Sequence, residues 1–241
     1  MSTLQVSNLQ KKYGKKQVLR GIDFSMHKGE VVGLLGPNGA GKTTCFYSIV
    51  GFIKPNGGDI LLNDHVITNL PMYRRARLGI SYLPQEASVF RKLSVEDNIW
   101  AIIENRNTLS TTEKRDLLES LLGDLGLQEK RKQPAYTLSG GERRRTEIAR
   151  SLAIDPHFLL LDEPFAGIDP IAVHEIKNII RILVDKNIGI LITDHNVRDT
   201  LEITRRSYII KDGQIVAEGD KAELLKNRLA REVYLGESFE A

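Results

Sequence analysis

Residues 36–43 read Gly36-Pro37-Asn38-Gly39-Ala40-Gly41-Lys42-Thr43, which fits the pattern G-x-x-x-x-G-K-[ST]. An apolar run precedes this loop, and a helical pattern follows it. The glycines let backbone N–H groups turn inward around phosphate oxygens, and a helix N-terminus adds positive potential. Lys42 supplies a charge for the outer phosphates, and Thr43 supplies a hydroxyl for Mg²⁺. The alternative is a glycine-rich turn before an ordinary helix, but the strand–loop–helix context favours phosphate binding.

A second cluster closes the apolar run Phe158–Leu161 with two carboxylates, Asp162 and Glu163. Open α/β sheets bind their ligands at the carboxyl ends of the strands. We therefore expect Asp162 to hold Mg²⁺ through water and Glu163 to orient or deprotonate the attacking water. Taken alone, the two carboxylates fit an exposed strand end equally well. The phosphate-loop motif in the same chain favours the functional interpretation.

A third segment, Leu138-Ser139-Gly140-Gly141-Glu142, has the form of a helix start. Ser139 is a suitable N-cap and Glu142 its capping-box partner, which is a purely structural role. A helix start with a hydroxyl and two glycines is also an anion site. Capping needs no double glycine, whereas close approach of a phosphate favours it. Both interpretations remain open from these residues alone.

Composition restricts the class of protein. The chain has 241 residues, of which 27% are charged and 41% hydrophobic, as in a globular domain with a sizeable core. A net charge of +3 argues against a dedicated nucleic-acid binder. The basic run Arg143–Arg145 is short, and we interpret it as a solvated helix face. We therefore expect no nucleic-acid partner.

Cysteine use and hydropathy indicate a cytosolic chain. Cys45 is the single cysteine, so no disulfide can form within the chain, and we expect it to pack as a small hydrophobe. No secretory signal is visible after Met1, and no apolar run reaches the ~18 residues of a membrane span. We therefore expect a cytoplasmic protein whose contact with a membrane is indirect, through partners.

The pattern of apolar residues predicts one α/β domain over residues 1–241. Residues 1–85 and 136–220 form its core with an antiparallel β subdomain, about 86–135 form an inserted helical lobe, and about 221–241 form a helical tail. Asp212-Gly213 marks a hairpin turn. The expected strands are Leu4–Leu9, Val18–Phe24, Glu30–Leu35, Gly58–Leu62, Ile80–Leu83, Phe158–Leu161, Ile188–Thr193, Ser207–Ile210 and Gln214–Ala217. The expected helices are Leu93–Glu104, Thr111–Leu127, Gly141–Ala153, Ile171–Asp185 and Lys221–Leu235.

The order of these three motifs resembles that of ABC-type ATPases over nearly the whole chain. The resemblance implies a P-loop NTPase core of the ABC-ATPase type that hydrolyses ATP with Mg²⁺ and works as a homodimer. In that family the segment matching Leu138–Glu142 contacts the γ-phosphate of the ATP held by the other subunit. Tyr13 matches the aromatic residue that stacks on adenine, and Gln85 matches the glutamine that senses Mg²⁺ and contacts the membrane partner.

The resemblance continues after the second carboxylate. His195 follows the apolar run Ile190–Thr193 and Asp194, and it matches the switch histidine of the family. Histidine is suited to sensing a γ-phosphate because it accepts or donates hydrogen bonds near neutral pH. Ala166-Gly167-Ile168-Asp169 matches the loop that crosses the dimer interface, although the commoner form is Ser-Ala-Leu-Asp.

The complete expected site follows from the motifs and the resemblance together. The catalytic residues are Glu163, His195 and Lys42. The ATP-binding residues are Tyr13, Gly36, Pro37, Asn38, Gly39, Ala40, Gly41, Lys42, Thr43, Thr44, Gln85 and Asp162. The Mg²⁺ ligands are Thr43, Gln85 and Asp162, and the residues acting on the partner subunit's ATP are Ser139, Gly140, Gly141 and Glu142. Asp169 belongs to the interface loop.

Several of these residues also have simpler explanations. A lone Tyr13 is commonly a surface or core aromatic, and only its place before Val18 in the first hairpin favours stacking. A lone His195 fits an ordinary polar loop. Asp169-Pro170 is a good helix start, with an N-cap followed by proline at the first helical position.

A docking groove is expected around Gln85–Leu93, where apolar and basic residues occur together. An aromatic residue beside an arginine is typical of interface hot spots. We expect this groove to receive a coupling helix of a membrane subunit, and the homodimer to dock on two such subunits. Its residues are Ala87, Val89, Phe90, Arg91 and Leu93. The alternative is that Phe90 plugs the helical lobe.

Three longer stretches resemble the ATPases of lipopolysaccharide export transporters of Gram-negative bacteria. They are Tyr82–Ile99, Glu163–Pro170 and Val233–Phe239. This implies a peripheral location on the cytoplasmic face of the inner membrane, where ATP drives extraction of lipopolysaccharide. The alternatives are the ATPase of a branched-chain amino-acid importer, a soluble ABC ATPase outside transport, and a nucleotide-binding protein that forms no dimer.

Overall fold

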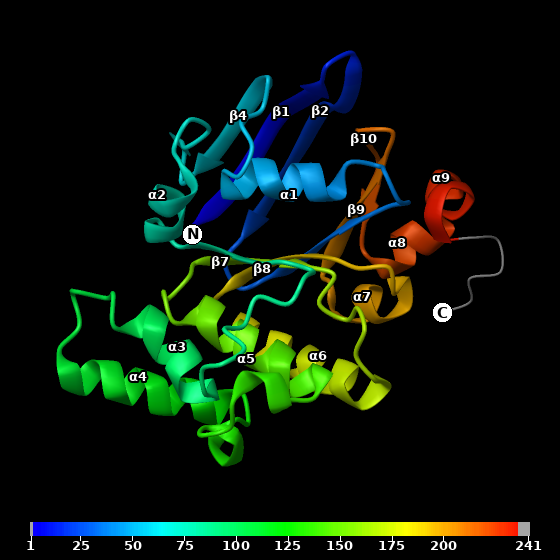
Figure 1. Ribbon diagram of the computed structural model, residues 1–241. Helices are drawn as coiled ribbons and strands as arrows, with labels where there is room; N and C mark the ends of the chain where they lie inside the picture. Colours follow the sequence, from blue (N-terminus) through cyan, green and yellow to red (C-terminus); the bar gives the residue numbers. More distant parts are fainter. Residues whose placement is uncertain (1, 236–241) are drawn as a thin grey trace.

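The computed structural model describes residues 2–235. Figure 1 shows an upper β layer, a central sheet and a lower layer of helices. The upper layer is a four-stranded antiparallel sheet in the order β2-β1-β4-β5. Its strands are β1 (Thr3–Tyr13), β2 (Lys16–His27), β4 (Gly57–Leu62) and β5 (His65–Val66). The expected antiparallel β subdomain therefore exists, and the short edge strand β5 was not foreseen.

The central sheet has six strands in the order β10-β9-β3-β8-β7-β6. Strands β9, β3, β8, β7 and β6 run parallel, and β10 is antiparallel to β9. Their bounds are β3 (Val31–Leu35), β6 (Ile80–Leu83), β7 (Phe158–Asp162), β8 (Gly189–Thr193), β9 (Arg206–Lys211) and β10 (Gln214–Gly219). Because the strands are parallel, the loops that follow β3, β6, β7 and β8 leave from the same edge of the sheet.

Helix α1 (Lys42–Val50) lies between the two sheets (Figure 1). Its side chains Cys45, Phe46 and Ile49 are fully buried against both of them. Burial raises the pKa of the Cys45 thiol to about 12, so it packs as a neutral hydrophobe, as expected. This packing fixes the N-terminus of α1 against the end of β3.

Four helices cover the other face of the central sheet (Figure 1). They are α3 (Val95–Ile103), α4 (Thr111–Asp124), α5 (Gly140–Leu152) and α6 (Pro170–Asp185). Alternation along the strands explains the two layers: Leu160 and Leu191 face α1, whereas Leu159 and Ile190 face these helices. The helices expected at 86–135 share one continuous core with α5, α6 and the sheet.

The C-terminal segment is a chain of short helices, and not the single helix expected over Lys221–Leu235. It consists of α8 (Lys221–Lys226), α9 (Arg228–Ala230) and a π-helical turn (Arg231–Leu235). Asn227 interrupts the helix with an extended backbone (ψ 118°), and its side chain caps α9. These elements pack against β9, β10 and α7 (Val197–Ile203). Residues 236–239 of the expected ending lie outside the described residues.

Candidate functional site

The phosphate-loop sequence connects β3 to α1, as the pattern predicts. Close packing explains its first glycine: a Cβ on Gly36 would lie 2.1 Å from the carbonyl oxygen of Ile210. Gly39 and Gly41 both have positive φ, which L side chains rarely adopt. The loop encloses a cavity of about 250 Å³, also lined by Lys16, Val18 and Glu163. The loop residues lining the cavity are Asn38, Gly39, Gly41, Lys42, Thr43 and Thr44.

Lys42 is folded back onto its own loop. Its Nζ donates hydrogen bonds to the carbonyls of Gly36 (2.7 Å) and Pro37 (3.1 Å). Burial lowers the pKa of Lys42, although the negative charges of Glu163 and Asp162 partly offset this effect. A buried ammonium held only by carbonyls and two nearby carboxylates is well placed to take a phosphate oxygen as a further partner.

Glu163 lies at the centre of the polar edge. Its Oε2 accepts a hydrogen bond from Gln85 Nε2 (2.6 Å), and its Oε1 is 2.7 Å from His195 Nε2. Glu163 has φ +47°, a left-handed conformation that is uncommon for a residue other than glycine. Its backbone N–H bonds to the carbonyl of Thr193 on β8, which holds this turn in place. The structure thus brings together three residues that lie far apart in the sequence.

Asp162 is buried behind Glu163 at the end of β7. The Tyr82 hydroxyl donates a hydrogen bond to its Oδ2 (3.0 Å). Burial raises the pKa of Asp162, and the charge of Glu163 acts in the same direction. The hydrogen bond from Tyr82 and the charge of Lys42 oppose the rise. Sequence reasoning did not find Tyr82, because an aromatic residue inside a strand carries no chemical pattern of its own.

The interpretation of Arg143–Arg145 as a solvated helix face is wrong for Arg144, which is only 6% exposed. Its guanidinium donates to the carbonyls of Pro84 (2.8 Å) and Asp162 (3.1 Å), and it pairs with Glu147 (3.1 Å). Arg144 therefore ties α5 to the loop carrying Gln85 and to the end of β7. Arg144 lies on the face of α5 that packs against the sheet. Its spacing along the helix from the buried residues Ile148 and Gly141 is the sequence feature that could have indicated its burial.

The segment 138–142 starts α5 with the expected capping box. Glu142 N–H donates to Ser139 Oγ (3.2 Å), and Ser139 N–H donates to Glu142 Oε2 (2.9 Å). The second glycine has a packing reason, because a Cβ on Gly141 would lie 2.7 Å from Ala172 Cβ on α6. Gly140 shares a small cavity of about 50 Å³ with Gln85 and Ile168. Its lining has no residue in common with the phosphate-loop cavity.

Two further expected residues lie near these cavities. Asp169 caps α6, where its Oδ1 accepts the N–H groups of Ile171 and Ala172 (both 3.0 Å). These hydrogen bonds support the interpretation of Asp169 as the N-cap of a helix. Asp169 can have this role and still belong to an interface loop. Tyr13 ends β1 with 49% of its surface exposed, opposite Lys16, which lines the phosphate-loop cavity.

The expected docking groove needs one correction. Val89 is 9% exposed and belongs to the core beneath α3, so it cannot form part of an exposed groove. Phe90 is 47% exposed, with the Arg150 guanidinium 4.4 Å from its ring centroid, so it does not plug the helical lobe. Ala87, Arg91 and Leu93 are also exposed, so the other four residues of the expected groove lie at the surface.

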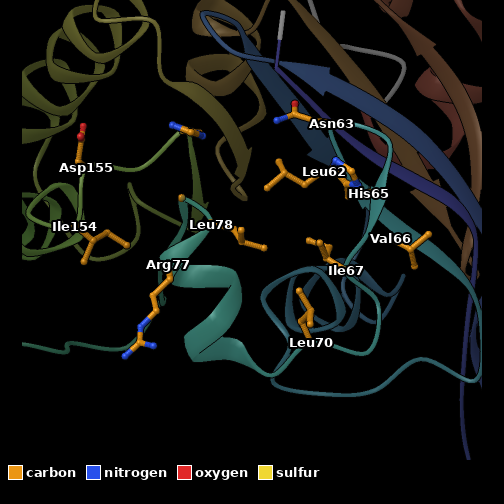
Figure 2. A pocket seen from close by; sticks show the side chains of 12 residues that line it. Leu62, Asn63, His65, Val66, Ile67, Leu70, Arg77, Leu78, Ile154 and Asp155 are labelled. Carbon is orange, nitrogen blue, oxygen red and sulfur yellow. The ribbon is translucent and has the colours of Figure 1, made fainter. Parts of the chain in front are cut away.

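Another cavity lies away from this chemistry. It encloses about 440 Å³ between the β4–β5 edge and the residues after α2 (Met72–Arg77). Figure 2 shows the apolar side chains of Leu62, Ile67 and Leu78 there, while Arg77 points away. Its charged lining residues, Arg77 and Asp155, are exposed to solvent. An apolar hollow without buried polar groups offers no means of orienting a nucleotide.

Comparison with known proteins gives a consistent result. The family model described as "ABC transporter" matches residues 19–166. The lipopolysaccharide export system ATP-binding protein LptB of Escherichia coli (strain K12) is 49% identical over 239 residues, which cover 99% of both chains. The protein of the same name from Acidithiobacillus ferridurans is 52% identical over 237 residues, 98% of both chains.

A solved structure supports the same fold. The crystal structure of the ADP conformation of an ATP-binding cassette of an ABC transporter superimposes with a TM-score of 0.87. It is 30% identical in sequence and covers 98% of this chain and all of its own. The expected P-loop core with its antiparallel sheet and its helices is therefore confirmed.

Proposed function

The chain belongs to the ABC transporter ATPase family, and we propose that it drives the export of lipopolysaccharide from the inner membrane. The export assignment rests on relatives of that name that match this chain over nearly its full length. The ATPase function has its own physical support. One observation carries it: Glu163, at the rim of the phosphate-loop cavity, is held between Gln85 and His195.

Hydrolysis of ATP needs a water molecule aimed at the γ-phosphorus atom and a group that receives its proton. Glu163 is the base in this proposal, because its carboxylate lines the cavity in which the phosphates would lie. His195 and Gln85 fix both oxygens of that carboxylate and so set its direction. Lys42 would leave the carbonyls of its loop and bind the outer phosphates.

The donor set also fits Mg²⁺. Thr43 offers a hydroxyl, Gln85 an amide oxygen and Asp162 a carboxylate, and Mg²⁺ prefers such oxygen ligands together with phosphate and water. When bound, the ion would neutralise charge on the β- and γ-phosphates. Burial raises the pKa of Asp162, and a nearby cation would act in the opposite direction and favour the ionised carboxylate.

A second copy of the chain would complete the site. Ser139 and Gly140 start α5 at a cavity separate from the phosphate loop, so within one chain they do not face the same phosphates. In a two-fold dimer each copy would present this helix start, with its free N–H groups, to the ATP of the other copy. Asp169 and its loop would lie at the same interface.

Membrane attachment would come through partners. Among residues 2–235, no helix combines the length and the apolar character needed to cross a bilayer. We propose that two membrane subunits dock through coupling helices at Phe90, Arg91 and Leu93, which are exposed beside the loop of Gln85. The chain would then sit on the cytoplasmic face of the inner membrane, in contact with the lipids only indirectly.

Depletion of the protein in its source organism tests the export function. We expect lipopolysaccharide to accumulate at the inner membrane and viability to fall, and a wild-type copy but not a Glu163→Gln copy should restore both. An importer of branched-chain amino acids would instead give a growth defect that added leucine rescues. That rescue, with normal lipopolysaccharide at the cell surface, would overturn the export assignment and leave the ATPase function intact.

A further inference from the structure

The C-terminal segment reaches the catalytic edge through a single side chain. Tyr234, in the π-helical turn after α9, donates its hydroxyl to the backbone carbonyl of Asp194 (3.0 Å). Tyr234 packs against the small core that joins β9, β10, α7 and the short C-terminal helices. The hydroxyl of Tyr234 therefore joins the C-terminal segment to the loop after β8.

The carbonyl of Asp194 belongs to the same peptide unit as the N–H of His195. Since a peptide unit is planar, a bond to this oxygen fixes the orientation in which the chain enters His195. The Asp194 side chain fixes the other side of the turn, accepting N–H groups from Phe165 and Asn196 (both 2.9 Å). The Tyr234 bond connects this turn to the C-terminal segment.

We propose that Tyr234 is a positioning residue for ATP hydrolysis, which holds the Asp194–His195 peptide so that His195 reaches Glu163. This inference rests on the ATPase function proposed above. His195 is half exposed, and the one ion-pair contact of its imidazole among residues 2–235 is the one with Glu163, so the position of its main chain matters for this contact. An anchored main chain reduces the conformations that the imidazole can explore, and such preorganisation is what catalytic hydrogen bonds require.

A merely structural role is the competing explanation, because Val233 and Ala230 on the same segment also pack against the core. The two explanations differ in what the hydroxyl does. If Tyr234 only packs against the core, its ring is needed and its oxygen atom is not. Tyr234→Phe would then leave kcat for ATP hydrolysis unchanged. A positioning residue needs the oxygen atom, and its effect must pass through His195.

The test measures ATP hydrolysis by the full chain in a double-mutant cycle. Tyr234→Phe should lower kcat about 3- to 10-fold, the effect of losing one hydrogen bond, and leave KM for ATP within about two-fold. In a His195→Ala background the same change should have no further effect, because the residue that it positions is gone. Tyr208→Phe is the control: Tyr208 is buried, whereas Tyr234 is partly buried, and the Tyr208 hydroxyl accepts a hydrogen bond from Arg206, away from the site.

Hydrogen–deuterium exchange gives a second measurement that does not depend on turnover. Amides of residues 195–200 should exchange faster in Tyr234→Phe than in the wild type, and Tyr208→Phe should leave them unchanged. The proposal would be overturned if Tyr234→Phe kept the wild-type kcat, or if this change lowered kcat by the same factor in the wild type and in His195→Ala. Hydrolysis by the wild-type chain would still support the proposed function in that case. A wild-type chain without ATPase activity would instead overturn the proposed function, and this inference with it.

Discussion

His195 Nε2 lies 2.7 Å from Glu163 Oε1, although the two residues belong to loops that follow different strands. The contact exists because β7 and β8 are parallel neighbours, with Asp162 directly opposite Thr193. The residues just beyond both strand ends are then forced to the same edge of the sheet. Gln85, after β6, reaches the second oxygen of Glu163 in the same way.

Glu163→Gln should abolish hydrolysis without abolishing ATP binding. The amide keeps the shape and hydrogen-bonding capacity of the carboxylate but cannot accept a proton, and loss of a positioned base costs about 10²–10⁴ in rate. Steady-state phosphate release and binding of a fluorescent ATP analogue measure the two effects separately. Glu86→Gln, at an exposed glutamate nearby, is the control and should retain wild-type turnover. Near-normal turnover by Glu163→Gln would show that another group is the base.

Sequence patterns predict most of this candidate site because its motifs are local. The phosphate loop, the capping box of Ser139 and the carboxylates at the end of β7 each carry their signal within a few residues. The contacts of Arg144 and Tyr82 could not be read in this way, since they depend on which face of α5 or β6 meets the sheet. Val89 was misassigned for the same reason: neighbouring residues in a loop can point to core and solvent.

Short elements were the other limit of sequence reasoning. Helix α2 and strand β5 have six and two residues, which is too few for a hydrophobic period to stand out. Helix α7 is also short, and its N-cap Asn196 directly follows His195, so the segment reads as a loop. By contrast, α6 spans 16 residues with an N-cap and an N1 proline, and its expected bounds differ from the structure by a single residue.

Mixing two inactive variants should restore activity if the working site spans two chains. Lys42→Ala removes the phosphate contact of one copy, and Ser139→Ala removes the hydroxyl offered to the other copy. An equimolar, fully exchanged mixture should recover about a quarter of the wild-type rate, since half of the dimers are mixed and each has one intact site. A mixture in which mixed dimers form, by differential tagging, but which stays at the level of its parents would contradict a shared site.

Phe90→Ala and Val89→Ala should separate docking from packing. Phe90 is exposed, so its truncation should leave the melting temperature and the ATPase rate of the isolated chain near wild type. Co-purification with the membrane subunits should be lost, as expected when a central aromatic anchor is removed. Val89 is buried, so its truncation should cost roughly 1–3 kcal/mol of unfolding free energy. A large fall in the melting temperature of Phe90→Ala would contradict a docking role.

Asp162→Asn should stabilise the nucleotide-free chain at neutral pH while it impairs hydrolysis. Burial raises the pKa of Asp162 in the folded state above its unfolded value, so the ionised carboxyl opposes folding wherever it is charged. The destabilisation by the charged carboxylate is complete when the pH is above the pKa of Asp162 in the folded state. It disappears when the pH falls below the pKa of Asp162 in the unfolded state. Asparagine carries no charge at any pH, and its side-chain oxygen can still accept the bond from Tyr82.

Thermal unfolding from pH 7 down to pH 4 measures this effect of Asp162→Asn. The variant should melt above the wild type at pH 7, and the difference should shrink as the pH is lowered, since the wild-type carboxyl then becomes neutral too. Asp116→Asn, on the exposed surface of α4, should show no such trend. With ATP and Mg²⁺ the order should reverse, because the wild type gains stability from ligand that the variant binds more weakly. If the difference in melting temperature between Asp162→Asn and the wild type did not change with pH, the buried charge of Asp162 would not be the cause of that difference.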